Sequence, residues 1–271
     1  MTEPTDASQW KKEAAQVFEA ETPHYETGRE NSHWYQTQLD FTMQALAAHS
    51  SGRSGGRVLD LGCAAGVEIA ALRAAGFTVV GADYVQLMLL SSQKRFAKDP
   101  QVGLSRADAE FLPFSSGSFD HVVCLGVLEY LQSYDRSIAE VQRVLRPGGI
   151  AVFALPSRVS LYHYSHTVEE AILAPIWRIV KRLLGKASTG TVPRHHRNTC
   201  IPGRFLTQLE QAGLHPVDHA NTAFLMAPLD RFWPEGQKRL ALSLERFGRT
   251  RLLGWMGSQF MVAVRKSESG S

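Results

Sequence analysis

Cysteine is scarce in this chain. Only three occur among its 271 residues, Cys63, Cys124 and Cys200, and they lie far apart. A disulfide-held secreted domain needs paired cysteines at regular spacings, so the sequence predicts reduced thiols and a cytoplasmic protein. No Cys and His residues have the spacing of a zinc site, and we expect no metal.

Long apolar runs and a strong net charge are also missing. The sequence has no run of about 18 apolar residues, which argues against a membrane-spanning helix. Its polar first residues, Met-Thr-Glu-Pro, lack the apolar core of a signal peptide. The net charge of +3 is too small by itself to predict a nucleic-acid partner. What remains is an ordinary globular chain, long enough for one large domain.

The most informative stretch is Arg57-Val-Leu-Asp-Leu-Gly-Cys-Ala-Ala-Gly66. Val58 and Leu59 predict a buried parallel strand that ends near Asp60, and the glycines predict a tight turn before a helix. In α/β sheets this arrangement forms a ligand-binding mouth. A dinucleotide fingerprint carries its pyrophosphate on Gly-x-Gly-x-x-Gly, whereas here an acid precedes the glycines. That acid would repel a diphosphate and suits a ligand that carries an amine or a sulfonium.

Strands and helices alternate along the rest of the chain. Asp135 is expected to cap its helix, and Arg146–Gly149 to form a turn. Repeated βα units require a parallel sheet, so the predicted fold class is α/β, a Rossmann-like doubly wound sheet. We expect an N-terminal helical cap at 1–50 and a main domain at 51–271, with cap insertions at 156–200 and 225–256. Strands are predicted at 58–61, 78–82, 102–105, 119–125, 150–155, 214–221 and 258–265, and helices at 33–49, 67–75, 85–98, 135–145 and 203–212.

Acidic residues recur where later strands should end. Asp83 follows the second strand, where a carboxylate can accept hydrogen bonds from a ribose diol. Asp108 follows the third strand, where it can accept the exocyclic amine of adenine. The fourth strand begins Phe119-Asp-His-Val, and the fifth is approached by Arg143-Val-Leu-Arg-Pro-Gly-Gly149. With the opening stretch these make five motifs in order.

Together these motifs resemble the class I S-adenosylmethionine-dependent methyltransferases. The resemblance is strongest to the small-molecule branch similar to ubiquinone and menaquinone biosynthesis methylases, and it covers residues 57–155. It implies a seven-stranded sheet with an antiparallel last strand, S-adenosyl-L-methionine as cofactor and S-adenosyl-L-homocysteine as product.

The resemblance also implies which residues bind the cofactor. Asp60 and the turn that follows it should lie under the methionine part, and Asp83 should hold the ribose, with Tyr84 and Met88 near the adenosine. Asp108 should meet the adenine, and backbone past the fourth strand the methionine amine. The full set is Tyr25, Asp60, Gly62, Cys63, Ala64, Gly66, Asp83, Tyr84, Met88, Asp108, Ala109, Leu125 and Gly126.

Two positions depart from the family pattern. Ala64 stands where the family usually has glycine, and alanine there would cost on the order of 1 kcal/mol if the backbone needs a positive φ. Tyr130 stands where the family often has histidine, which removes the obvious general base. Weak candidates for a catalytic group are therefore Tyr130 itself and the histidines of the insertion, His163, His166 and His196.

The insertion at 156–200 carries most of the basic excess. It holds seven Arg or Lys residues against two Glu, and residues 167–184 predict a basic amphipathic helix begun by a Thr167/Glu170 capping box. Such a helix could cover the core, form a greasy lid over an apolar acceptor with an anionic end, or contact a membrane surface.

The predicted reaction is methyl transfer from S-adenosylmethionine to a small molecule. We expect a hydroxyl oxygen of a secondary metabolite, quinone or lipid-linked compound as acceptor. Nitrogen and carbon acceptors, or an inactive cofactor-binding regulatory relative, are the alternatives. A nucleic-acid methyltransferase is disfavoured because the fourth strand lacks an Asn/Asp-Pro-Pro-aromatic loop and a Pro-Cys nucleophile. A nicotinamide dehydrogenase would need glycine at position 64.

Overall fold

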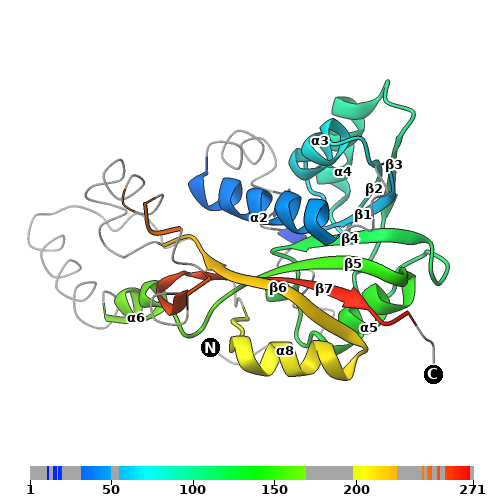
Figure 1. Ribbon diagram of the computed structural model, residues 1–271. Coiled ribbons are helices and arrows are strands. Elements are labelled where there is room, and N and C mark those ends of the chain that lie inside the picture. Colours follow the sequence, from blue (N-terminus) through cyan, green and yellow to red (C-terminus); the bar gives the residue numbers. More distant parts are fainter. Residues whose placement is uncertain are drawn as a thin grey trace, which may run out of the picture.

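A single seven-stranded sheet forms the centre of the protein (Figure 1). The strands are ordered β3-β2-β1-β4-β5-β7-β6, and β7 alone runs antiparallel to its neighbours β5 and β6. The expected α/β sheet with an antiparallel last strand is confirmed. The strands are β1 (Arg57–Leu61), β2 (Thr78–Asp83), β3 (Val102–Arg106), β4 (Phe119–Leu125), β5 (Leu145–Pro156), β6 (Leu214–Thr222) and β7 (Gln259–Lys266). The computed structural model describes residues 11, 15–16, 18–19, 32–49, 55–168, 198–224, 240, 243–245, 249–250 and 254–268.

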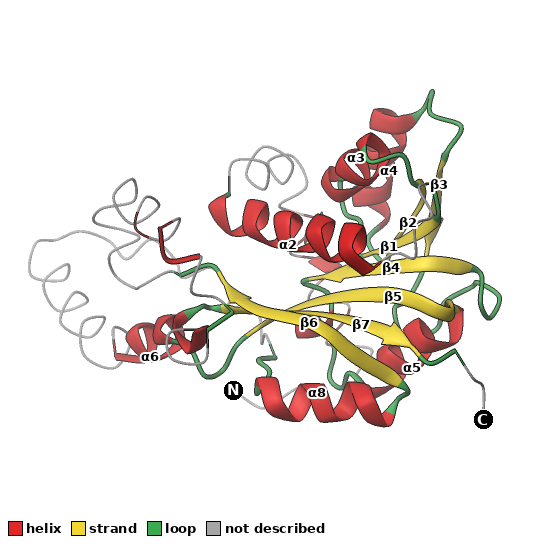
Figure 2. Cartoon of the chain, in the orientation of Figure 1, coloured by secondary structure: helices red, strands yellow, loops and turns green. Residues whose placement is uncertain are grey.

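Helices cover both faces of the sheet (Figure 2). One face packs against α2 (His33–His49), α3 (Val67–Ala74) and α4 (Gln86–Phe96), and the other against α5 (Asp135–Val144) and α8 (Pro202–Gln211). Successive residues of β1 point to opposite faces of the sheet: Leu59 is buried on the α5 side and Val58 on the α2 side. This double burial explains why the central strands are almost continuously apolar. Short elements complete the described chain: η1 (Leu128–Tyr130), α6 (Leu161–Val168) and η4 (Gly254–Met256).

Three local expectations are wrong. Arg146–Gly149 belongs to β5 instead of forming a separate turn; the strand bulges there, because Leu145 pairs with Phe119 and Ile150 with His121. Asp135 does not cap α5: the N-cap is Tyr134, and the Asp135 carboxylate accepts hydrogen bonds from Ser133 and Gln208.

Thr167 does not begin a helix either. It lies in the last turn of α6, where its hydroxyl donates to the carbonyl of His163 at 2.8 Å. The residue thus lies inside a helix that the sequence did not predict, where its hydroxyl donates to a carbonyl one turn earlier. The remainder of the predicted amphipathic helix, 169–184, lies outside the described residues, and the division into cap and main domain stays a prediction. Among the described residues, none of the helices is long and apolar enough to cross a membrane.

His121 should make stability depend on pH. Its ring is 5% exposed, and burial lowers its pKa although Asp120 opposes the shift. Below its unfolded pKa of about 6.5, the unfolded chain binds a proton that the folded chain resists. The free energy of unfolding should therefore fall as the pH drops from 7 toward 5, by at most about 1.4 kcal/mol per pH unit. Denaturant titrations at several pH values should show that the free energy of unfolding depends less steeply on pH for His121→Gln than for the natural protein. An equal dependence on pH would exclude His121 as the group responsible.

Candidate functional site

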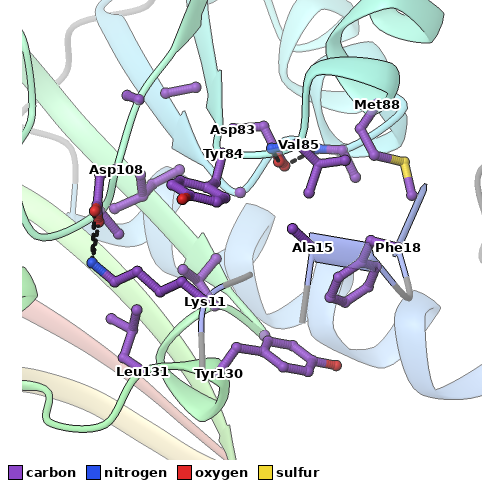
Figure 3. Close-up of a pocket in the computed structure, with 18 of the residues that line it drawn as sticks. Lys11, Ala15, Phe18, Asp83, Tyr84, Val85, Met88, Asp108, Tyr130 and Leu131 are labelled. Atoms are coloured by element: carbon purple, nitrogen blue, oxygen red, sulfur yellow. Dashed lines mark hydrogen bonds and ion pairs between the residues drawn. The ribbon is translucent and has the colours of Figure 1, made fainter. Parts of the chain in front are cut away.

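A cavity of ≈ 760 Å³, partly open to solvent, lies where β1, β2 and β4 end (Figure 3). Carboxyl ends of parallel strands are where α/β sheets bind ligands. The cavity is roofed by three residues from the N-terminal segment, Lys11, Ala15 and Phe18. The other lining residues are Leu61, Gly62, Ala64, Ala82, Asp83, Tyr84, Val85, Met88, Ala107, Asp108, Ala109, Leu125, Gly126, Val127, Tyr130 and Leu131.

The turn after β1 forms one wall of the cavity. The amides of Gly62 and Cys63 both donate to the carbonyl of Ala82, at 2.7 and 3.2 Å, which ties the turn to the end of β2. Gly62 has φ +82°, and a Cβ on it would lie 2.2 Å from Cγ2 of Val127. Only glycine satisfies both the backbone angle and the contact. The turn therefore presents bare backbone to the cavity.

Asp83 anchors the same turn from β2. Its Oδ2 accepts the amide of Ala64 at 2.9 Å and its Oδ1 the amide of Val85 at 2.8 Å. Burial raises the pKa of this carboxyl, and the backbone hydrogen bonds offset part of the shift. Each oxygen keeps a second lone pair that can accept a hydroxyl or an amine. Asp83 is thus both a brace for the turn and an acceptor at the cavity wall.

Asp108 lies at the opposite end of the cavity, after β3. Both of its oxygens contact Nζ of Lys11, at 2.8 and 2.6 Å, and Lys11 also pairs with Glu110. Oδ1 of Asp108 further accepts the amide of Glu110 at 3.0 Å, which fixes the carboxylate in its turn. A second carboxylate, able to accept hydrogen bonds, therefore lines the cavity.

Apolar and aromatic side chains fill the space between these polar ends. Met88 is 1% exposed, and Tyr84 and Leu131 also line the cavity. The rings of Phe18 and Tyr130 meet edge to face with centroids 5.0 Å apart, which links the N-terminal segment to the loop after β4. Flat apolar walls between hydrogen-bonding ends suit a ligand with a planar ring and polar edges.

Several proteins similar to this chain are named methyltransferases. A family model described as a methyltransferase domain matches residues 59–153. A demethylmenaquinone methyltransferase from Clavibacter sepedonicus is 34% identical over 179 residues, which cover 64% of this chain and 72% of that relative. The chain belongs to the S-adenosylmethionine-dependent methyltransferases. A ubiquinone biosynthesis O-methyltransferase from Aromatoleum aromaticum is 32% identical, over 40% of this chain and 47% of its own length, so the chain spans under half of that relative.

Solved structures agree on the fold. A 1,6-didemethyltoxoflavin-N1-methyltransferase from Burkholderia thailandensis, solved with bound 1,6-didemethyltoxoflavin and S-adenosylhomocysteine, superposes with a TM-score of 0.61 over 98% of this chain and 93% of its own, at 14% identity. An S-adenosylmethionine-dependent methyltransferase from Mesorhizobium loti gives 0.55 over 88% of this chain and all of its own, at 19% identity. At such identities the likeness concerns the methyltransferase fold alone.

Most residues expected to bind the cofactor of this methyltransferase meet in one cavity. The structure brings ten of the expected site residues together there: Gly62, Ala64, Asp83, Tyr84, Met88, Asp108, Ala109, Leu125, Gly126 and the candidate catalytic residue Tyr130. Asp60, Cys63 and Gly66 do not line it. Asp60 is 1% exposed, and Gly66 caps α3 close to Phe96 and Ser92. Tyr25, His196 and the side chain of His166 lie outside the described residues, whereas His163 is described on α6 and does not line the cavity.

Ala64 does adopt the backbone conformation that the family usually gives to glycine. Its φ is +43°, and its side chain is 6% exposed beside Val85 and Met88. A positive φ costs an alanine roughly 1–2 kcal/mol. The hydrogen bond from its amide to Asp83 and the burial of its methyl group hold the residue in this conformation.

Cys63 is a buried packing residue with an unreactive thiol. Burial, with the charges of Asp60, Asp83 and Glu68, raises the pKa of its thiol well above the ordinary value. A thiol held in its neutral form is a poor nucleophile. The small side chain is required because its Sγ lies close to Gly81 on β2.

Several cavity residues escaped the sequence analysis. Val127 and Leu131 follow the fourth strand and could have been found by extending its exit loop. Lys11, Ala15 and Phe18 belong to the N-terminal segment, where only Tyr25 was proposed. Their i, i+4, i+7 spacing is a recognisable helical stripe, but nothing in the sequence shows that the stripe covers this cavity.

The described residues fit S-adenosylmethionine, the cofactor of this enzyme family. The fit rests on the bare backbone at Gly62 and on the carboxylates of Asp83 and Asp108, which line the cavity and are able to accept the hydroxyl and amine hydrogens of an adenosine. Among the described residues, no group of three His, Cys, Asp or Glu side chains could hold a metal ion.

Proposed function

We propose that this methyltransferase acts on a hydroxyl oxygen of a small secondary metabolite, quinone or lipid-linked compound. The observation that supports its cofactor site most directly is the meeting of two carboxylates, from Asp83 and Asp108, with the glycine turn in one cavity. Relatives named for menaquinone and ubiquinone methylation support an acceptor of the quinone class. Nitrogen or carbon acceptors are the alternative, and the 1,6-didemethyltoxoflavin-N1-methyltransferase is a structural neighbour named for a nitrogen position.

Each end of the cavity takes a distinct part in the proposed site. Asp83 accepts the two ribose hydroxyls through the free lone pairs of Oδ1 and Oδ2. Asp108 accepts the adenine amine, and the amide of Ala109 donates to the ring beside it. Gly62 and the backbone at Leu125 and Gly126 hold the methionine part.

Position and orientation supply most of the catalysis that these residues offer. When bound, S-adenosylmethionine supplies an electrophilic methyl group for in-line displacement by a lone pair of the acceptor. The chain's own residues fix the donor against the acceptor and exclude water, effects that can account for about 7–11 kcal/mol of a barrier. Tyr130 lines the cavity and is the candidate that contacts the acceptor hydroxyl. Its ring is held by Phe18 at 5.0 Å.

Competitive binding and product analysis test this function. Calorimetry should show that the protein binds S-adenosylhomocysteine, with no heat from NAD at the same concentrations. Incubation with methyl-labelled S-adenosylmethionine and matched phenols, quinols, anilines and enols should then label the phenols or quinols. Labelling of only the anilines or only the enols would overturn the oxygen assignment, and binding of NAD in place of S-adenosylhomocysteine would overturn the cofactor site.

A further inference from the structure

The carboxylate proposed to bind adenine, that of Asp108, forms an ion pair with Lys11. Nζ of Lys11 lies 2.8 Å from Oδ1 and 2.6 Å from Oδ2 of Asp108, and the two side chains are 13% and 26% exposed. Figure 3 shows the Lys11 side chain extended across the cavity toward Asp108. Lys11 is therefore part of the cavity wall at the place where a purine amine is expected.

Lys11 is held there by more than its charge. Lys11, Ala15 and Phe18 are each in helical conformation and all three line the cavity. Phe18 rests edge to face on Tyr130. The burial of Lys11 would lower its pKa, but hydrogen bonds to Asp108 and Glu110 outweigh that effect and raise it. The lysine is thus a charged donor throughout the physiological pH range.

The adenine amine and Lys11 are donors for the same acceptor. Oδ1 of Asp108 already accepts the amide of Glu110 and contacts Nζ, and Oδ2 contacts Nζ as well. A carboxylate has about four lone-pair positions, and the Glu110 amide and the two contacts of Nζ take three of them. The fourth is on Oδ2, which Nζ approaches to 2.6 Å, so an adenine amine must compete with the ammonium for this oxygen. Resting on the proposed role of Asp108, the amine takes its position as Lys11 moves away.

We infer that Lys11 is an internal competitor for the adenine subsite, an ion-pair latch that the cofactor must open. Glu110 gives the displaced ammonium a place to go. Its carboxylate already pairs with Nζ and is 14% exposed, so Lys11 can leave Asp108 without losing its counter-charge.

The latch lowers the apparent affinity for the cofactor. A ligand that binds only the open arrangement has its dissociation constant raised by the inverse of the open fraction. Removing the ammonium should therefore tighten binding, which is the opposite of what deletion of a cofactor contact does. Salt weakens ion pairs between partly exposed groups, so added NaCl should tighten binding by the natural protein.

Calorimetry with S-adenosylhomocysteine tests the latch. Lys11→Met keeps the length of the side chain and removes its charge, and we expect a dissociation constant about three- to tenfold lower. Lys98→Met, an exposed lysine beyond α4, is the matched control and should leave it unchanged. Glu110→Gln should weaken binding when Lys11 is present, and should have no effect on binding in a protein that also carries Lys11→Met. An unchanged or higher dissociation constant for Lys11→Met overturns the latch.

A second variant separates the latch from the adenine subsite itself. Asp108→Ala removes the acceptor and the latch together, so its loss of affinity should be larger when Lys11→Met is already present. If Asp108→Ala has no effect in that background, the proposed adenine position fails. If it weakens binding there while Lys11→Met alone changes nothing, the adenine position stands and the latch is excluded. Melting temperatures of all variants confirm that each is folded.

Discussion

Replacing Gly62 by valine should abolish S-adenosylhomocysteine binding. A Cβ at this position would lie 2.2 Å from Cγ2 of Val127, far inside any normal contact, and the backbone has φ +82°. A β-branched residue is strained there whatever space is made. The turn must shift, and with it the amide that donates to Ala82 at 2.7 Å. Calorimetry should show no binding, an affinity loss of at least about a hundredfold, on the order of 3 kcal/mol.

Two companion variants separate the contact from the backbone angle. Gly62→Ala with Val127→Ala removes most of the clash but keeps the strain, so binding should return only in part. Gly103→Val on the edge strand β3 is the control: its Cβ would meet nothing closer than 3.8 Å, and cofactor affinity should not change. Normal affinity of a folded Gly62→Val protein would mean that the cavity is not the cofactor site.

The sequence predicted the sheet well because each strand carries its own signal. Val58 and Leu59 are buried on opposite faces of one strand, and such two-sided burial requires a continuous apolar run, which is readable without tertiary contacts. Helix α2 was predicted with the same ends that it has, His33–His49. One error occurred at a residue whose partner is distant in sequence. Asp135 looks like a cap but bonds Gln208 across 73 residues.

The residues of the site likewise divide into those that the sequence predicts and those that it does not. Asp83 and Asp108 were found because their position at strand ends follows from the sheet, and both line the cavity. Asp60 and Cys63 lie in the first glycine motif, yet both are buried and do not line the cavity, whereas Gly62 and Ala64, with positive φ, do. Lys11 was missed because its contact with Asp108 spans 97 residues, and a lone lysine in a polar segment carries no signal of such a partner.

Asp83→Ala should weaken S-adenosylhomocysteine binding by about 1–3 kcal/mol, the range for removing a buried hydrogen-bond partner. The fold should also be affected, because Oδ2 and Oδ1 of Asp83 accept the amides of Ala64 and Val85. Alanine leaves both amides without their acceptor, so the melting temperature should also fall. Burial raises the pKa of Asp83, so removing its charge returns part of the lost stability.

Asparagine at the same position separates charge from hydrogen bonding. Asp83→Asn keeps one acceptor oxygen but turns an amide donor toward one backbone amide, so affinity and melting temperature should lie between those of Asp83→Ala and the natural protein. Asp99→Ala is the control, because Asp99 does not line the cavity and forms an ion pair with Arg73, with Oδ2 2.9 Å from Nε. It should lose stability without losing affinity. If Asp83→Ala behaved like Asp99→Ala, its carboxylate would only brace the turn, and the ribose would have to be held by another group at the end of β2.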